Sequence, residues 1–186
     1  ESELGGGIFS GGAGSALTRT RLTNSTVSGN RARSHGGGIF SRRPTELDLR
    51  NATIANNVAE GSEFGGGGIY SETQVFASNT ILAGNTAALG PDCAGNAIAS
   101  GGFNLVGNGS GCEFNNAIGD MLGNSETPID PMMGPLQANG GPTKTHALLS
   151  GSPALDTGNS SLGTDQRGAT RPQGSGSDIG AFERES

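Results

Sequence analysis

Short stretches in the first half of the chain alternate between polar and apolar residues and are separated by glycine. In residues 45–51 the alternation puts Leu47, Leu49 and Asn51 on one face of a strand and the charged residues on the other, and residues 18–24 repeat this pattern. No segment has the i, i+3, i+4 and i+7 spacing of an amphipathic helix. The pattern therefore predicts short strands whose aliphatic side chains face inward.

Two motifs recur through the first half of the chain at a similar period. Gly-Gly-Gly-Ile-Phe-Ser occupies positions 5–10 and 36–41, and Gly-Gly-Gly-Ile-Tyr-Ser occupies positions 66–71. A second motif, which ends in Asn, spans positions 22–30, 49–57 and 77–85. Recurrence at about 30 residues is typical of a coil in which each turn contributes several short strands. The sequence therefore predicts an all-β fold, a right-handed parallel β-helix (a solenoid) with tight corners at the glycines.

Stacking the repeats in register predicts which side chains meet between turns. Arg19 would lie over Glu46, and Arg21 over Asp48, on strands about 4.8 Å apart. Two columns of amides are predicted to form hydrogen-bonded ladders, one of Asn24, Asn51 and Asn79 and one of Asn30, Asn57 and Asn85. An aromatic column is predicted from Phe9, Phe40 and Tyr70. Asn24 and Asn51 also match the N-glycosylation pattern, but the predicted inward direction of their column favours the ladder.

Composition supports a folded, glycine-rich chain and limits its partners. The 186 residues include 35 Gly and 8 Pro, and a net charge of −6 is too small to favour disorder despite the low aliphatic content. An acidic chain with a single Lys is not expected to bind nucleic acid. No apolar run is long enough for a membrane span, and a start at Glu1 without Met or a signal segment indicates the mature part of a longer protein.

We expect one domain over residues 1–186, made of three regions. Residues 1–85 hold the regular repeat turns, residues 86–133 one or two irregular turns, and residues 134–186 an irregular C-terminal capping region that covers the open end of the coil. Cys93 and Cys112 are either two thiols or one disulfide. The Gly- and Asn-rich stretch between them favours a disulfide, which would staple the irregular turns.

Five strings in the second half follow one another in a characteristic order. They are Gly-Pro-Asp-Cys at 90–93, Asn-Gly-Gly-Pro-Thr at 139–143, Gly-Ser-Pro-Ala at 151–154, Asp-Gln-Arg-Gly at 165–168 and Asp-Ile-Gly-Ala-Phe-Glu at 178–183. This order resembles the choice-of-anchor Q domain of bacterial surface proteins, and the repeats are similar to the polymorphic outer-membrane-protein type. The family usually has an apolar residue and Pro after Asp-Gln-Arg-Gly, whereas this chain has Ala169-Thr170-Arg171-Pro172. The resemblance implies an extracellular or cell-surface location, which also favours the disulfide, and it implies no known reaction.

Several polar groups are candidates for chemistry. Glu46 and Asp48 lie two residues apart on one strand, a spacing of about 7 Å that suits a glycosidase, but the Arg residues aligned with them favour surface ion pairs. The carboxylates of the C-terminal strings, with Arg167, could hold Ca²⁺ or form an ion-pair network, and we favour the network; they are Asp156, Asp165, Asp178 and Glu183. His35 and His146 lack a nearby nucleophile motif, so structural roles are expected.

The functional expectation is a non-catalytic structural or adhesive module without a cofactor. Its expected partners are further copies of itself, stacked head to tail into a filament, or glycans and other components of the cell surface. The alternative is an enzyme or binding protein for polysaccharides, with Arg19, Arg21, Glu46 and Asp48 on its working face.

Overall fold

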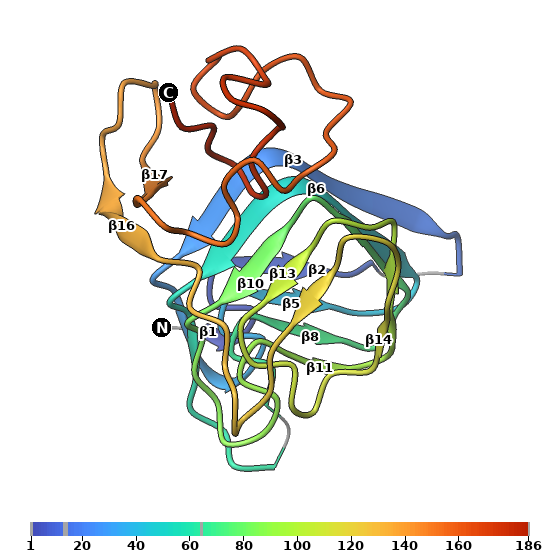
Figure 1. Cartoon of the computed structure of the whole chain (residues 1–186). Helices are drawn as coiled ribbons and strands as arrows, with labels where there is room; N and C mark the ends of the chain where they lie inside the picture. The colour runs from blue at the N-terminus through green and yellow to red at the C-terminus, as the bar shows by residue number, and fades with distance from the viewer. Residues whose placement is uncertain (1, 13–14, 64, 186) are drawn as a thin grey trace.

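The computed structural model is a parallel β-solenoid of about four turns with a smaller region packed against its side (Figure 1). The structure describes residues 2–12, 15–63 and 65–185. All the regular elements among these residues are strands, so none is a helix that could span a membrane. The predicted all-β, parallel solenoid fold is confirmed.

Three parallel sheets form the walls of the coil. The first sheet contains β1 (Ser2–Leu4), β4 (Arg31–His35) and β7 (Val58–Ala59). The second contains β2 (Ile8–Ser10), β5 (Ile39–Ser41), β8 (Ile69–Ser71) and β11 (Cys93–Gly95). The third contains β3 (Thr18–Ser28), β6 (Thr45–Ala55), β9 (Val75–Ser78), β10 (Ile81–Ala83), β12 (Ile98–Ser100), β13 (Leu105–Val106), β14 (Phe114–Asn115) and β15 (Met121–Leu122).

The coil becomes narrower toward its C-terminal end. In the second sheet Ile8 pairs with Ile39, and Ile39 pairs with Ile69, so the first two turns contain nearly equal lengths of chain. The next turn is shorter, because Ile69 already pairs with Cys93. The last turn is shorter still, since Ile98 pairs with Phe114 in the third sheet. Residues 86–133 therefore continue the second and third sheets in register, with shorter strands, and the sequence prediction described them only as irregular turns.

The third sheet bends at one asparagine in each of the first three turns. Asn24, Asn51 and Asn79 have φ angles of 47°, 49° and 48°, in the left-handed region that Asn tolerates better than most residues. Before the bend, alternation directs Leu47 and Leu49 into the solenoid, where both are fully buried. At the bend the alternation is interrupted, so the asparagines do not continue the inward row of leucines.

The glycine triplets and the Asn motifs meet inside the coil. The third glycine of each triplet lies against the side-chain amide of an asparagine. A Cβ atom added to it would lie 2.8–2.9 Å from the amide nitrogen; the pairs are Gly7 with Asn30, Gly38 with Asn57 and Gly68 with Asn85. Since real Cβ atoms do not approach so closely, only glycine leaves room for the asparagines. The first glycine of each triplet has a positive φ, 65° in Gly36, which places a tight corner there as predicted.

Residues 133–185 lie along the side of the solenoid, over the second half of the third sheet (Figure 1). They begin with an antiparallel pair, β16 (Met133–Gln137) and β17 (Thr145–Leu148). Their apolar side chains form a second core with residues on the outer face of that sheet, in which Ile81, Leu105 and Ile179 are almost fully buried. The structure therefore corrects the prediction that this region covers the open end of the coil: it covers one wall, because the outer face of that wall is apolar.

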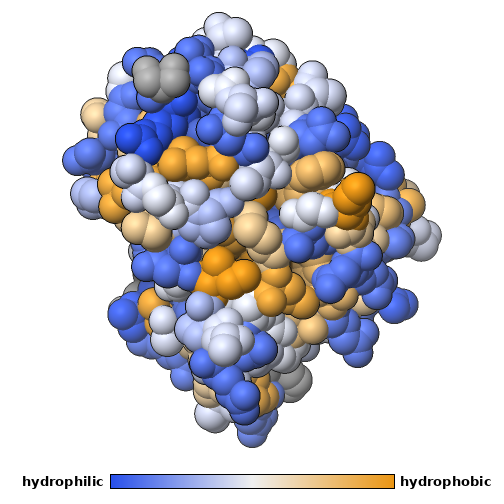
Figure 2. All heavy atoms as spheres, in the orientation of Figure 1, coloured by the Kyte–Doolittle hydropathy of each residue, from blue (hydrophilic) through white to orange (hydrophobic). Residues whose placement is uncertain are grey.

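The C-terminal end of the coil carries exposed apolar side chains. Figure 1 shows the later turns in front of the earlier ones, and Figure 2 shows hydrophobic residues gathered around the middle of this face, with hydrophilic residues toward the top and bottom. Ile118 and Leu122, in the narrow last turn, are 78% and 40% exposed. Within the described residues, this end of the coil thus has no cover comparable to the region over the third sheet.

Candidate functional site

A cluster of charged side chains lies on the outer face of the third sheet, before the bend. Arg19 Nη2 is 2.7 Å from Glu46 Oε2, and Arg21 Nε is 2.9 Å from Asp48 Oδ2, in the predicted register. Arg50, which the sequence prediction did not include, donates from Nε to the other oxygen of Asp48 at 3.1 Å. Two guanidinium groups therefore hold one carboxylate.

The environment of Asp48 keeps it ionised. Burial alone would raise the pKa of Asp48, but hydrogen bonds from Arg50 and Arg21, together with their positive charges, hold it below its ordinary value. A general acid of a glycosidase needs the opposite shift. The arrangement of Asp48 suits an anchor for two arginines and does not suit a proton donor.

A groove of about 390 Å³ runs beside this cluster across the turns of the solenoid. Arg19, Asp48 and Arg50 line its first part, and Phe76 and Ser78 follow on the next turn. Beyond them the lining residues become small, from Ala99 to Gly101. The groove exists because long side chains on the first two turns give way to short ones on the fourth. Phe76 aligns with Asp48 in the sheet register, a signal that was present in the repeat alignment.

The second predicted amide ladder is present inside the coil. Asn30 Nδ2 donates to Asn57 Oδ1 at 2.9 Å, and Asn57 Nδ2 donates to Asn85 Oδ1 at 2.9 Å. Each acceptor oxygen also receives the backbone N–H of the preceding asparagine. The ladder therefore has a direction, with donors on the N-terminal side and acceptors on the C-terminal side of every step.

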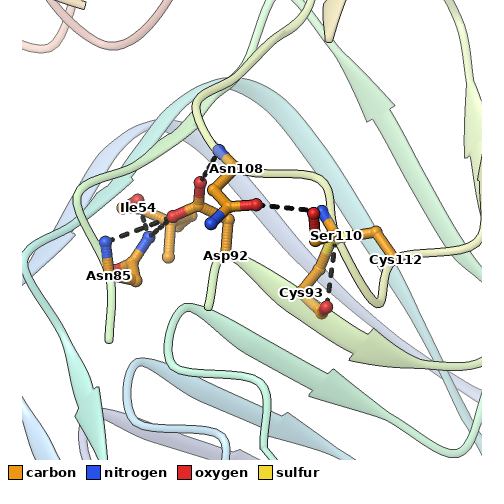
Figure 3. Close-up of a disulfide and its surroundings, with 7 residues drawn as sticks. All are labelled: Ile54, Asn85, Asp92, Cys93, Asn108, Ser110 and Cys112. Atoms are coloured by element: carbon orange, nitrogen blue, oxygen red, sulfur yellow. Dashed lines mark hydrogen bonds between the residues drawn. A yellow bond between two sulfur atoms is a disulfide. The ribbon is translucent and has the colours of Figure 1, made fainter. Parts of the chain in front are cut away.

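A buried carboxylate, Asp92, ends this ladder (Figure 3). Its Oδ1 accepts from the backbone N–H and Nδ2 of Asn85, and its Oδ2 accepts from the N–H of Asn108 at 2.6 Å. Because β11 pairs with β8, Gly90-Pro91-Asp92-Cys93 aligns with Gly66-Gly67-Gly68-Ile69. The segment is thus a fourth copy of the glycine motif in which Asp replaces the third glycine and its side chain fills the ladder position.

A second internal ladder, which the sequence prediction missed, ends in the same way. Asn104 Oδ1 accepts from the N–H of Thr80 at 3.0 Å. Asp120 Oδ1 then accepts from the N–H and Nδ2 of Asn104, and Asp120 Oδ2 accepts from the N–H of Ala117. Since a carboxyl group, unlike an amide, has no N–H to donate, both ladders stop at an aspartate near the C-terminal end of the coil.

The predicted ladder of Asn24, Asn51 and Asn79 is not formed. These amides bond the C-terminal region instead: Asn24 donates to the carbonyl of Thr164, Asn51 accepts from the Ser160 hydroxyl, and Asn79 exchanges two hydrogen bonds with the backbone of Asn159. The reason is the left-handed bend, which turns these side chains toward the segment packed over the third sheet. Their column therefore fixes the C-terminal region to the solenoid.

The predicted disulfide joins Cys93 to Cys112, with 5.1 Å between their Cα atoms (Figure 3). It closes the segment that carries Asn108 against β11 and so holds the N–H of Asn108 near Asp92. A groove of about 590 Å³ lies beside this segment, lined by Leu89, Pro91 and Ser110 among others. The disulfide thus stabilises the end of the ladder and one edge of that groove.

The C-terminal carboxylates bond arginines and backbone N–H groups. Asp165 binds Arg167 at 2.8 Å, and Glu183 binds Arg171 at 2.8 Å in a pair whose side chains are almost wholly buried. Asp178 accepts from the N–H groups of Asp156 and Arg184, and Asp156 accepts from that of Gly176. Within the described residues, no three His, Cys, Asp or Glu side chains gather as a metal would need. Arg171, noted in the sequence only as a departure from the family pattern, completes this network.

The remaining predicted residues have structural contacts. His146 is buried and bonds the Ser28 hydroxyl and the carbonyl of Gly134, so it links β17 to the third sheet. His35 packs against the rings of Phe40 and Tyr70. The aromatic column is present, with ring centroids 5.5 Å apart for Phe9 and Phe40 and 5.6 Å apart for Phe40 and Tyr70.

Compared with models of known protein families, with curated proteins and with solved structures, the chain matches none significantly. The class that the geometry defines is a disulfide-bonded parallel β-solenoid with carboxylate-terminated polar ladders.

We expect Asp92→Asn to destabilise the fold in a pH-dependent way. The new amide would direct an NH₂ group at the N–H of Asn108, which costs about 1–3 kcal/mol for the lost acceptor. Burial raises the pKa of Asp92 in the folded protein. A carboxyl group whose pKa is higher in the folded than in the unfolded protein stabilises the fold fully at pH values below its unfolded pKa of about 3.9. This stabilisation is lost as the pH rises through the folded pKa. The gap in unfolding free energy between wild type and variant should therefore narrow as pH rises.

Urea unfolding of both proteins between about pH 3 and pH 8 tests this expectation. The exposed Glu126→Gln variant is the control, because it removes a carboxylate outside the ladders. A gap that stays constant or widens with rising pH would contradict the role given to Asp92.

Proposed function

We propose that this chain is a non-catalytic structural or adhesive module of an extracellular or bacterial cell-surface protein, in which the first turn of the solenoid stacks against a further solenoid turn. The single observation that carries the proposal is the open core of that turn. Ile8 and Leu22 are partly exposed, whereas their register partners Ile39 and Leu49 are fully buried. Among the residues that the structure describes, strands β1, β2 and β3 each pair along one edge only.

The direction of the ladder specifies which kind of turn fits there. None of the described groups donates to Asn30 Oδ1, although the same oxygen in Asn57 and Asn85 accepts two N–H groups. A preceding turn that carries Asn at this position would supply both donors. The C-terminal end of a second copy would bring Asp92 and Asp120 instead, whose side chains have no N–H to donate. The ladder therefore favours another turn of the repeat over head-to-tail stacking of this chain into a filament.

Two further features support the location and the absence of catalysis in this proposal. Disulfides persist in oxidising compartments, so the bond between Cys93 and Cys112 supports export. The carboxylate of Asp48 is held ionised between two arginines, which favours a structural over a proton-transferring role. The bacterial surface location comes from the resemblance to choice-of-anchor Q proteins.

The experiment is to fuse a copy of residues 31–57 to the N-terminus and to measure amide hydrogen exchange. We expect the amides of β3 to exchange at least about tenfold more slowly, because they gain ladder partners and a covered core. In a matched control the Asn copied from Asn57 is replaced by Asp, and the protection should be smaller. Unchanged exchange of β3 would refute the proposal, and fibres of the native chain in negative-stain images would assign the open end to a second copy.

A further inference from the structure

The groove beside Asp48 offers an unused hydrogen-bonding edge. Arg50 engages Asp48 through Nε only, and none of the described residues bonds its Nη1 or Nη2. The side chain of Arg50 is 51% exposed, so this edge faces solvent. Two parallel N–H groups on a fixed guanidinium are the geometry that binds a carboxylate through both oxygens. The bond to Asp48 therefore fixes the position of Arg50 and leaves its Nη1 and Nη2 groups available to a ligand.

The rest of the groove provides the surface for a sugar ring. Phe76 lies on the next turn, in register with Asp48, and Ser78, which pairs with Arg50, lines the groove beside it. An aromatic face next to a hydroxyl group complements the apolar C–H face and the hydroxyl edge of a sugar. Arg19 stands at the other end, and the turns between it and Gly101 span about 14 Å at about 4.8 Å per strand. This length accommodates several linked sugar units.

We propose that this groove binds an acidic oligosaccharide, with a uronate carboxylate on the Nη edge of Arg50 and a sugar ring on Phe76. The inference goes beyond the structural role proposed above, since it assigns a ligand to a side wall that stacking of turns leaves open. Nucleic acid fits less well. A phosphate backbone needs a continuous basic track, whereas Glu46 and Asp48 interrupt the arginines here.

Calorimetric titration with a galacturonate hexasaccharide tests the proposal, with the fully methyl-esterified hexasaccharide as the matched ligand. We expect only the carboxylated form to bind, more weakly as salt increases. Arg50→Gln and Phe76→Ala should each weaken binding by about tenfold or more, the range expected for a charge-assisted hydrogen bond or a stacked aromatic ring. Melting temperatures of the variants establish that they are folded.

Arg42→Gln is the control, because Arg42 is similarly exposed but follows the second sheet, away from the groove. It should leave the affinity unchanged. Equal losses in the Arg42 and Arg50 variants, equal binding of the methyl ester, no binding of either hexasaccharide, or stronger binding of single-stranded DNA would each overturn the proposal. None of these outcomes depends on whether a further turn stacks on β3, so the two proposals fail separately.

Discussion

Replacement of Arg171 by methionine is expected to lower the free energy of unfolding by about 3–5 kcal/mol, because it leaves a buried carboxylate without its counter-charge. Arg171 donates to Glu183 Oε2 at 2.8 Å and to the carbonyls of Asp178 and Gly180. The side chains of Arg171 and Glu183 are 0% and 1% exposed. Methionine fills a similar volume, so the decrease in unfolding free energy reflects the lost charge and hydrogen bonds more than a new cavity.

Urea denaturation followed by circular dichroism measures this effect. Arg184→Met is the matched control, since Arg184 is exposed and, among the described residues, its one hydrogen bond is from its backbone N–H. The double variant Arg171→Met with Glu183→Leu should recover part of the stability, because an apolar pair avoids the unpaired charge. A loss below about 1 kcal/mol for Arg171→Met would show that solvent reaches Glu183 and that the network contributes little.

Removal of the disulfide is expected to be the second large effect. The Cys93→Ala, Cys112→Ala variant should lose about 3 kcal/mol, the value expected for a closed loop of this length. Hydrogen exchange should accelerate mainly around Asn108 and β11, because the crosslink holds this segment against the end of the ladder. Strands β3 and β6 are paired along most of their length and should keep their protection in the same experiment.

Reductant serves as the control for this prediction. It should lower the melting temperature of the wild type toward that of the double variant and leave the variant unchanged. A variant as stable as the wild type, or a loss of protection spread evenly over all strands, would mean that the disulfide does not stabilise the C-terminal turns in particular.

The regular turns could be predicted because a repeat fixes its own neighbours. Once the period is known, each residue of one turn lies beside the equivalent residue of the next, about 4.8 Å away. The pairing of Arg21 with Asp48 and the ladder through Asn57 follow directly from that alignment. The fourth copy of the glycine motif was harder to identify, since Pro91 and Asp92 replace two of its glycines and only the pairing of β11 with β8 reveals the equivalence.

The shape of the groove and the buried network depended on features that a repeat does not encode. The register places Phe76 beside Asp48, but a groove forms there because the turns differ in side-chain length. Arg171 and Glu183 lie in a region without repeats, where the partner of each charge is set by how irregular segments pack. Sequence reasoning found the carboxylates there and paired them with Arg167 alone.

By itself the sequence determined the solenoid, its period, its inter-turn charge pairs and the ladder through Asn57, because all of these follow from register. It favoured a disulfide over two thiols without deciding between them. Only the tertiary structure decided where residues 133–185 lie. Alternation predicted that Asn51 points inward, but its left-handed φ turns the amide toward Ser160. That contact joins segments far apart in the sequence, and it forms because the apolar outer face around Ile81 is buried by the C-terminal region.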